Sequence, residues 1–281
     1  MNLTVSPLSN VLGAEIVGLD LSRPLAPLAV EALRDAFHEH LILLFRGQDI
    51  SWEQQIDFAR QFGPLGVRKR NPNDRPEGAE SDHMMLVSNI RKDGKPIGSL
   101  PDGEMLFHHD MCYVPAPDMA TMLYAIEPTR DGGHTLFANM HAAYDTLDDD
   151  LKATIKGHEV MQIYNYIPTL RVEADDDPEK YDHYVQPAVI VHPVTGRKAL
   201  YINQLMSARI EGLPREHSEA VLTAIRTHLD RPDLSYEHTW RAGDLMMWDN
   251  YCTCHARTDF PPEQTRLLRR CTVAGEELIP A

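Results

Sequence analysis

The spacing of apolar side chains predicts two helices and a strand near the start of the chain. Residues 28–40 carry apolar side chains at helical intervals, as an amphipathic helix does. The apolar run 41–45 then predicts a buried strand, because it is short and is followed by Arg-Gly. Ser51 and Gln54 have the spacing of a helix capping box. We therefore expect a second helix from there to about Phe62, where Gly-Pro follows.

After residue 118 the pattern changes to short strands separated by turn residues. We expect strands at about 119–126, 135–138, 189–192, 199–203, 236–240, 244–248 and 266–273, and helices at about 139–156 and 214–229. Many short strands without a βαβ rhythm favour a mainly β fold with flanking helices, as a double-sheet barrel or a jelly roll, over a parallel sheet. We expect a double-stranded β-helix core, that is a jelly roll, in one domain spanning residues 1–281.

Residues 66–106 differ from both halves, because they are rich in Gly and Pro and contain one short strand candidate at 84–88. The basic triplet Arg-Lys-Arg begins at Arg68. Long loops in compact domains are often binding loops or lids, so we predict an active-site lid here. A merely solvated insertion is the alternative.

Composition narrows the range of partners. The 281 residues include 27 Lys and Arg against 42 Asp and Glu, a formal net charge of −15 at pH 7. Nonspecific binding to nucleic acid or to an anionic membrane needs a basic surface, so neither partner is expected. No apolar run approaches a membrane span, no secretory signal is recognisable, and four cysteines are too few for a disulfide scaffold. These features predict a cytoplasmic protein.

The chain contains fourteen histidines, which suggests metal binding or acid–base chemistry. His108 and Asp110 are two positions apart, and on a strand such side chains point to the same face. A second histidine from a distant strand would complete the 2-His-1-carboxylate set that binds non-haem Fe(II). The alternative is a buried histidine that is hydrogen-bonded to a nearby aspartate. His109, between the two, should point to the opposite face and serve a structural role.

The C-terminal part strengthens the metal interpretation. His255 ends the string 243–255, 145 positions after Asp110, and Arg266 follows 11 positions later. This arrangement resembles the Fe(II)/2-oxoglutarate dioxygenases of the taurine dioxygenase/TfdA family. Further matches occur in the family's order at residues 12–21, 44–48, 58–63, 132–137 and 248–250. The resemblance therefore covers nearly the whole chain.

The resemblance implies a set of residue roles. His108, Asp110 and His255 would be the ligands of Fe(II), and Arg266 with the Thr135 hydroxyl would bind the distal carboxylate of 2-oxoglutarate. An arginine suits that role because its planar fork matches a carboxylate with two charge-assisted hydrogen bonds. The implied reaction uses O2, releases succinate and CO2, and hydroxylates or oxidatively cleaves a substrate.

The substrate is the least defined part of the prediction. In the taurine enzyme an arginine at the position of Arg270 holds the substrate sulfonate, so Arg270 is the expected anion anchor. Arg269 is its rival, because adjacent strand residues face opposite ways. Arg68, in the predicted lid, and Tyr113 are further candidate contacts, although Arg68 could be a solvated loop charge. We expect a small, anionic substrate such as a sulfonate, sulfate ester or aryloxyalkanoate, and a homodimer or homotetramer.

Other functions compete for the same residues. A zinc-dependent hydrolase could use the His/Asp/His set to activate water, but it has no need of a carboxylate clamp made by Arg266 and Thr135. Cys252-x-Cys254 before His255 could suggest a zinc site, yet no second Cys/His pair of suitable spacing is present. A halogenase would lack the carboxylate ligand that Asp110 supplies, and a non-catalytic barrel would usually lose a ligand. Trp248 either packs near the iron or is a core residue.

Overall fold

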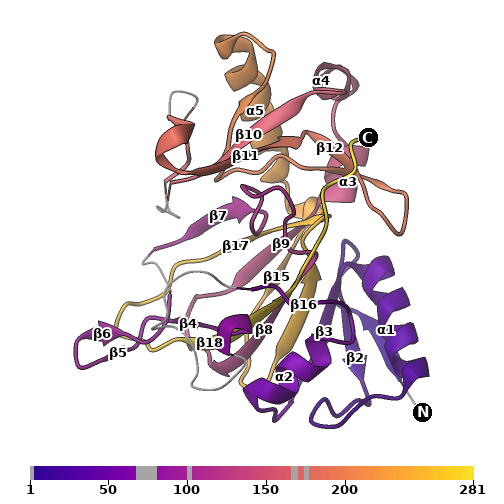
Figure 1. Ribbon diagram of the computed structural model, residues 1–281, viewed down its shortest axis with the longest axis vertical. Helices are drawn as coiled ribbons and strands as arrows, with labels where there is room; N and C mark the ends of the chain where they lie inside the picture. The colour runs from indigo at the N-terminus through magenta and orange to yellow at the C-terminus, as the bar shows by residue number, and fades with distance from the viewer. Residues whose placement is uncertain (1–2, 68–80, 100–102, 166–169, 174–176) are drawn as a thin grey trace.

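The computed structural model describes residues 3–67, 81–99, 103–165, 170–173 and 177–281, and Figure 1 shows its ribbon. Arg68 lies outside the described residues. A seven-stranded sheet has the order β1 (Thr4–Pro7), β2 (Ala14–Val17), β3 (Ile42–Phe45), β16 (Leu245–Asp249), β8 (Ala120–Glu127), β18 (Leu267–Val273) and β4 (Met85–Ser88). A four-stranded sheet has the order β15 (Ser235–His238), β9 (Thr135–Asn139), β17 (Thr253–Arg257) and β7 (Met105–His108). The fold is therefore mainly β, as expected.

Smaller sheets and helices surround these two. A three-stranded sheet joins β11 (Asp182–Pro187), β10 (Glu159–Tyr164) and β14 (Ser207–Ile210), and hairpins join β12 (Val189–Val191) to β13 (Lys198–Leu200) and β5 (Arg91–Lys92) to β6 (Lys95–Pro96). The helices are α1 (Pro27–His40), α2 (Trp52–Ala59), α3 (Met140–Asp145), α4 (Asp149–Ile155) and α5 (Arg215–Leu229). In Figure 1, α1 and α2 lie beside the seven-stranded sheet, and α4 and α5 lie with the three-stranded sheet at the far end.

Alternation along the central strands sorts side chains into two cores. In β3, Leu43 and Phe45 pack in the core that includes α1 and α2, whereas Ile42 and Leu44 pack in the core that includes the four-stranded sheet. β16 and β18 have the same parity as β3, whereas in β8 the odd-numbered Leu123 and Ala125 belong to the core of the four-stranded sheet. Because every one of these β3 side chains is buried, neither face of the sheet is left to solvent here. Even-numbered residues of β16 and β18 therefore face the interior between the two large sheets.

Most predicted elements are confirmed, and the differences have local causes. Ser51 and Gln54 form the expected capping box, but α2 ends at Ala59, three residues before Phe62. The expected helix 139–156 is two helices, because Asp148 caps a new helix start with its side chain. The pattern did not predict β1, β2, β10, β11, β14 and β17, several of which lack a clear alternation of apolar and polar residues.

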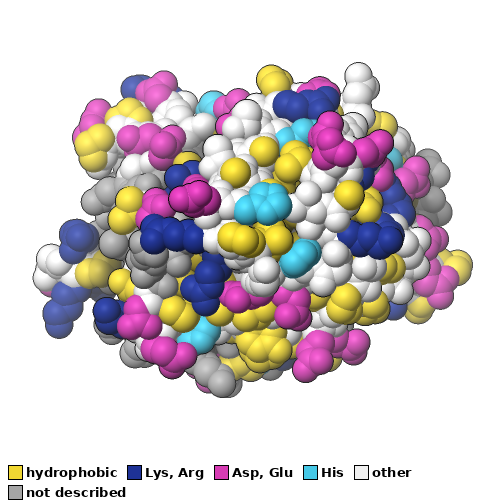
Figure 2. Space-filling model, turned by 90° about the horizontal axis from the view of Figure 1, so that it is seen from above, with side chains coloured by type: hydrophobic (Ala, Val, Ile, Leu, Met, Phe, Trp, Pro, Cys, Tyr) yellow, Lys and Arg dark blue, Asp and Glu magenta, His cyan; other side chains and the backbone are white. Residues whose placement is uncertain are grey.

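On the face shown in Figure 2, acidic and basic side chains are interspersed, and the basic ones form no continuous area. Within the described ranges, no helix is both long and apolar enough to cross a membrane.

Candidate active site

Two histidines and one aspartate meet between the large sheets. Asp110 Oδ1 lies 4.0 Å from His108 Nε2 and 3.9 Å from His255 Nε2, and the ligand atoms of all three side chains lie within 4.8 Å of one another. His108 ends β7 and is paired in register with His255 of β17, which explains how residues 147 positions apart meet. His108 Nδ1 lies 2.9 Å from the Leu106 carbonyl oxygen, to which it donates, so the lone pair of Nε2 points to the cluster.

The predicted reason for the His108–Asp110 pairing is wrong. We expected both on one strand, but β7 ends at His108, and Asp110 begins a turn. Met111, which follows, has a φ of 56°, a left-handed conformation that is uncommon outside glycine. The turn, and not strand alternation, brings the carboxylate back beside His108.

Electrostatics keep all three side chains in the protonation states that a metal requires. Burial lowers the pKa of His108 and, still more, that of His255, so both rings are neutral near pH 7. Burial alone would raise the pKa of Asp110, but Arg270, the two histidines and the Thr121 hydroxyl hold it well below its usual range. The donor set is therefore two neutral imidazoles and one carboxylate.

The neighbouring His109 and Cys254 face away from this cluster. The His109 ring stacks on Tyr201 with centroids 4.1 Å apart, and burial lowers its pKa to about 3. Cys254 Sγ lies 3.3 Å from His109 Nδ1, and burial raises the pKa of the Cys252 and Cys254 thiols well above the usual value. Both thiols lie in the hydrophobic core and away from the cluster, so these residues pack as small core side chains.

Arg266 and Thr135 line the same cavity as the cluster. Arg266 is 2% exposed, and no described carboxylate lies within ion-pair distance of it. Burial, and then repulsion by Arg257, lowers the pKa of Arg266 to about 9, so it remains charged at pH 7. Gly133, at a φ of 65°, lets the guanidinium approach, because a Cβ there would lie 3.3 Å from Arg266 Nε. A buried cation of this kind favours an anionic ligand.

Arg257 is a cavity residue that the sequence prediction missed. It lies two positions after His255 on β17, it is 7% exposed, and its guanidinium lies 5.6 Å from the Phe260 ring centroid. Its Nη2 donates to the Gly103 carbonyl oxygen, just before β7. The i, i+2 spacing from His255 is the signal that could have found it.

The structure separates Arg270 from its rival. Arg270 Nη2 lies 2.8 Å from Asp110 Oδ2, and Arg270 lines the cavity. Arg269 points to the helix side, where its Nε donates to Gln55 Oε1 and its Nη2 donates to the Ile50 carbonyl oxygen. Only Arg270 is therefore placed to meet a molecule in the cavity.

The cavity has a volume of about 860 Å³ and a largely apolar wall. Five methionines contribute to it: Met84, Met85, Met105, Met111 and Met206. Tyr113 also lines it, and its ring stacks on Tyr164 with centroids 4.8 Å apart at 11°. Trp248 lines it as well, 4.9 Å from the His255 ring. The wall suits an apolar ligand body.

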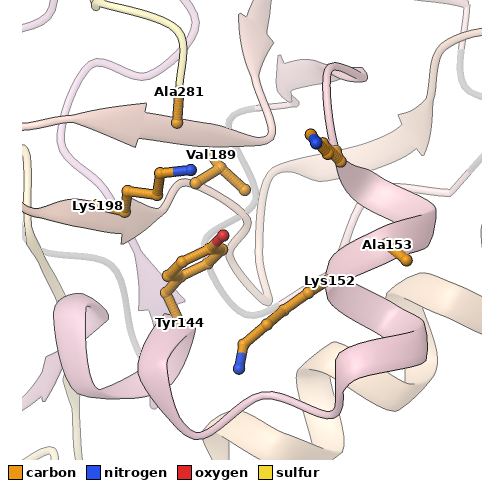
Figure 3. Close-up of a pocket in the computed structure, with 7 residues that line it drawn as sticks. Tyr144, Lys152, Ala153, Val189, Lys198 and Ala281 are labelled. Atoms are coloured by element: carbon orange, nitrogen blue, oxygen red, sulfur yellow. The ribbon is translucent and has the colours of Figure 1, made fainter.

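Two other features resemble sites but lie elsewhere. His38, His192 and Asp249 also cluster within 4.8 Å, but His192 Nδ1 accepts the Thr195 amide at 3.1 Å, so its proton is on Nε2 and is donated to Asp249 at 2.9 Å. A smaller pocket of about 190 Å³ has Tyr144 with the Lys152 and Lys198 ammonium groups each 5.8 Å from its ring centroid (Figure 3). It shares no lining residue with the large cavity.

Comparison with known proteins decides the family. The family model "Taurine catabolism dioxygenase TauD, TfdA family" matches residues 4–272. The chain belongs to the TauD/TfdA family. It is 30% identical to the alpha-ketoglutarate-dependent 2,4-dichlorophenoxyacetate dioxygenase of Cupriavidus pinatubonensis, over 99% of this chain and 100% of the relative. It is 33% identical to pentalenolactone F synthase of Streptomyces avermitilis, over 96% and 93%.

A solved structure supports the same assignment for this TauD/TfdA chain. The structure of AAD-2 in complex with Mn(II) and N-oxalylglycine matches with a TM-score of 0.82 and 31% identity, over 100% of both chains. This TauD/TfdA member is therefore a 2-oxoglutarate-dependent dioxygenase, as the resemblance implied. Nothing in these comparisons favours the zinc hydrolase.

Proposed function

We propose that His108, Asp110 and His255 hold Fe(II) and that the enzyme uses O2 and 2-oxoglutarate to oxidise an anionic substrate with an apolar body. The observation that carries this proposal is the two-histidine, one-carboxylate cluster in one cavity with a buried arginine. Such a donor set leaves coordination positions open on iron, whereas structural zinc sites are usually closed by four ligands. When bound, Fe(II) supplies the electron-transfer chemistry that couples the decarboxylation of 2-oxoglutarate to oxidation of the substrate.

The cosubstrate end of the cavity is assigned to Arg266 and Thr135. An anionic carboxylate there would relieve the cost of burying the Arg266 charge, because it supplies the missing counter-ion. Thr135 Oγ1 accepts a hydrogen bond from Trp240 Nε1 at 3.0 Å, so the hydroxyl proton remains available for donation. The two groups together would orient 2-oxoglutarate and select a dicarboxylate.

The substrate end is assigned to Arg270, with Tyr113 and the methionine wall around it. Arg270 can donate to an anionic group, while the methionines adapt to the shape of an apolar body. The names of the relatives point the same way, since one acts on 2,4-dichlorophenoxyacetate. An aryloxyalkanoate therefore fits the cavity better than a short sulfonate that lacks an apolar body.

Two architectural expectations belong to the same proposal. The facing seven- and four-stranded sheets would be the two halves of a jelly roll, and the match of the family model over residues 4–272 supports one domain. Residues 66–106 would be the lid, because His83, Met84, Met85, Val87 and Ser99 of this segment line the cavity.

The test of the function is a two-stage experiment. Anaerobic addition of Fe(II) and 2-oxoglutarate should produce a weak visible charge-transfer band, and this band should be absent in Asp110→Ala. Succinate release should then be measured with O2 across aryloxyalkanoates, sulfate esters and sulfonates, and it should be fastest with an aryloxy acid. Absence of the band in the wild-type protein, or Zn(II)-dependent hydrolysis of an ester in the absence of 2-oxoglutarate, would contradict the proposal.

A further inference from the structure

The two carboxylate oxygens of Asp110 lie in different surroundings. Oδ1 faces the two histidines, at 4.0 Å from His108 Nε2 and 3.9 Å from His255 Nε2. Oδ2 instead accepts a hydrogen bond from Thr121 Oγ1 at 2.8 Å and forms an ion pair with Arg270 Nη2 at 2.8 Å. The carboxylate is therefore already divided into a ligand oxygen and a restrained oxygen.

Thr121 is itself held in place by a buried amide. Asn250 Nδ2 donates to Thr121 Oγ1 at 2.9 Å, and both side chains are fully buried. The hydroxyl accepts from Asn250, so its only proton is committed to Asp110. Thr121 lies on β8, and Asn250 directly follows β16, the strand paired with β8. The hydrogen bonds from Asn250 to Thr121 and from Thr121 to Asp110 thus connect the turn after β7 to the centre of the seven-stranded sheet.

We propose that Thr121 is a positioning residue that makes Asp110 bind the metal through one oxygen only. This inference rests on the proposed iron site. A carboxylate that bound through both oxygens would take one more coordination position of the metal, and that position would be lost to the cosubstrate or to O2. Holding Oδ2 through Thr121 and Arg270 would keep the position open.

Thr121 differs from Arg270 in that it cannot be recruited by the substrate. The Arg270 guanidinium is on a long side chain at the cavity surface, and an anionic substrate would compete with Asp110 for it. Thr121 is 0% exposed and has a short side chain that Asn250 restrains. Thr121 therefore keeps the orientation of Asp110 constant while Arg270 turns between the carboxylate and the substrate.

The experiment measures metal binding to the apoprotein, without turnover. Mn(II) is titrated calorimetrically into the wild type, Thr121→Val and Thr121→Ser. Loss of a hydrogen bond to a metal ligand lowers metal affinity by roughly 10- to 100-fold in other metal sites, and we expect a loss in this range for Thr121→Val. Thr121→Ser keeps the hydroxyl and should bind Mn(II) within about threefold of the wild type. If the valine variant does not fold, Thr121→Ala gives the same test.

A matched control comes from the neighbouring strand. Thr272 of β18 is paired in register with Thr121, and its hydroxyl is hydrogen-bonded to Asp118 instead of Asp110. Thr272→Val should therefore leave the Mn(II) affinity unchanged. A general loss of order in the sheet would lower the affinity of both valine variants equally and would overturn the assigned role.

The outcomes distinguish the two levels of the proposal. If Asp110→Ala abolishes Mn(II) binding and Thr121→Val does not weaken it, the positioning role is wrong and the metal site stands. If Asp110→Ala binds Mn(II) as tightly as the wild type, the metal site itself is wrong. A loss in Thr121→Val that Thr121→Ser restores supports both.

Discussion

Single hydrogen bonds determine how the buried polar groups of the cavity can act. Trp240 Nε1 donates to Thr135 Oγ1 at 3.0 Å, which directs the threonine proton elsewhere. Arg266 has no described carboxylate partner and is almost fully buried, so its charge is available to a ligand. Thr135 and Arg266 are common residue types. They can bind a ligand here because the hydrogen-bond donors that they do not use within the protein face the cavity.

Replacing Trp240 with Phe should raise the KM for 2-oxoglutarate by about five- to tenfold. Loss of one hydrogen bond to Thr135 is worth about 1 kcal/mol, and the hydroxyl proton would no longer have a fixed direction. Trp52→Phe, on α2, removes a partly buried tryptophan that does not line the cavity and should leave this KM unchanged. Equal KM values in the wild type and Trp240→Phe would show that the indole does not orient Thr135.

Replacing Arg266 with Gln should weaken 2-oxoglutarate binding by roughly 10- to 100-fold, because a charge-assisted hydrogen bond is worth about 1.5–3 kcal/mol. The melting temperature of the apoprotein should not fall, since the variant removes a buried cation without a described counter-ion. Calorimetric titration of the metal-loaded protein with 2-oxoglutarate measures the first effect, and a thermal melt measures the second. An unchanged affinity would move the carboxylate site away from Arg266.

At the scale of elements, the alternation of side chains along β18 turns the adjacent Arg269 and Arg270 to opposite faces of the sheet. Arg270 shares its face with Leu268, which belongs to the core between the large sheets. Arg269 points to the other core, where it stacks on Tyr124 with its guanidinium 4.7 Å from the ring centroid. In β8 the odd-numbered residues face the core between the large sheets, so Thr121 lies beside Asp110 and Met122 packs against the helices.

Replacing Arg270 should therefore change substrate binding, whereas replacing Arg269 should change thermal stability. Arg270→Gln should raise the KM for an aryloxy acid by at least about tenfold, because a charged contact is lost, with a small change in melting temperature. Arg269→Gln loses bonds to Gln55 and to the Ile50 carbonyl, so its melting temperature should fall by several degrees at an unchanged KM. The reverse result would show that Arg269 faces the substrate.

At the scale of the whole molecule, the protein buries several histidines in the neutral form. Burial lowers the pKa of His109 to about 3 and also lowers the pKa values of His141 and His238. In the unfolded chain these rings take up protons below about pH 6.5, whereas in the folded chain they do so only at lower pH. The unfolded state then binds more protons, so the free energy of unfolding must fall as the pH decreases.

Thermal melts should therefore show a steady loss of stability from pH 7 towards pH 4. For His109 the window runs from the unfolded value near 6.5 to the folded value of about 3. His109→Gln removes one such ring, so its melting temperature should depend less steeply on pH across the same range. Parallel pH profiles for the variant and the wild type would contradict the assignment of His109 as a buried neutral ring.

Several helices and strands could be predicted from the local pattern of residues, whereas the arrangement of the site depends on contacts between distant parts of the chain. The apolar run at 41–45, the Ser51 capping box and the helix at 214–229 follow from neighbouring residues alone, and the structure confirms them. Ordered motifs along the chain were enough to indicate the family, which the family model confirms. The sequence determined these because periodicity and spacing are local properties.

Only the tertiary structure decided how the chemistry is arranged. The side of β18 that faces the cavity and the restraint of Asp110 by Thr121 depend on contacts between different strands and turns of the fold. Alternation says that Arg269 and Arg270 differ in direction but not which one faces inward, because that depends on what packs on each face of the sheet. The sequence thus determines which reactive residue types are present, and the packing of the sheets determines which of their atoms remain free to react.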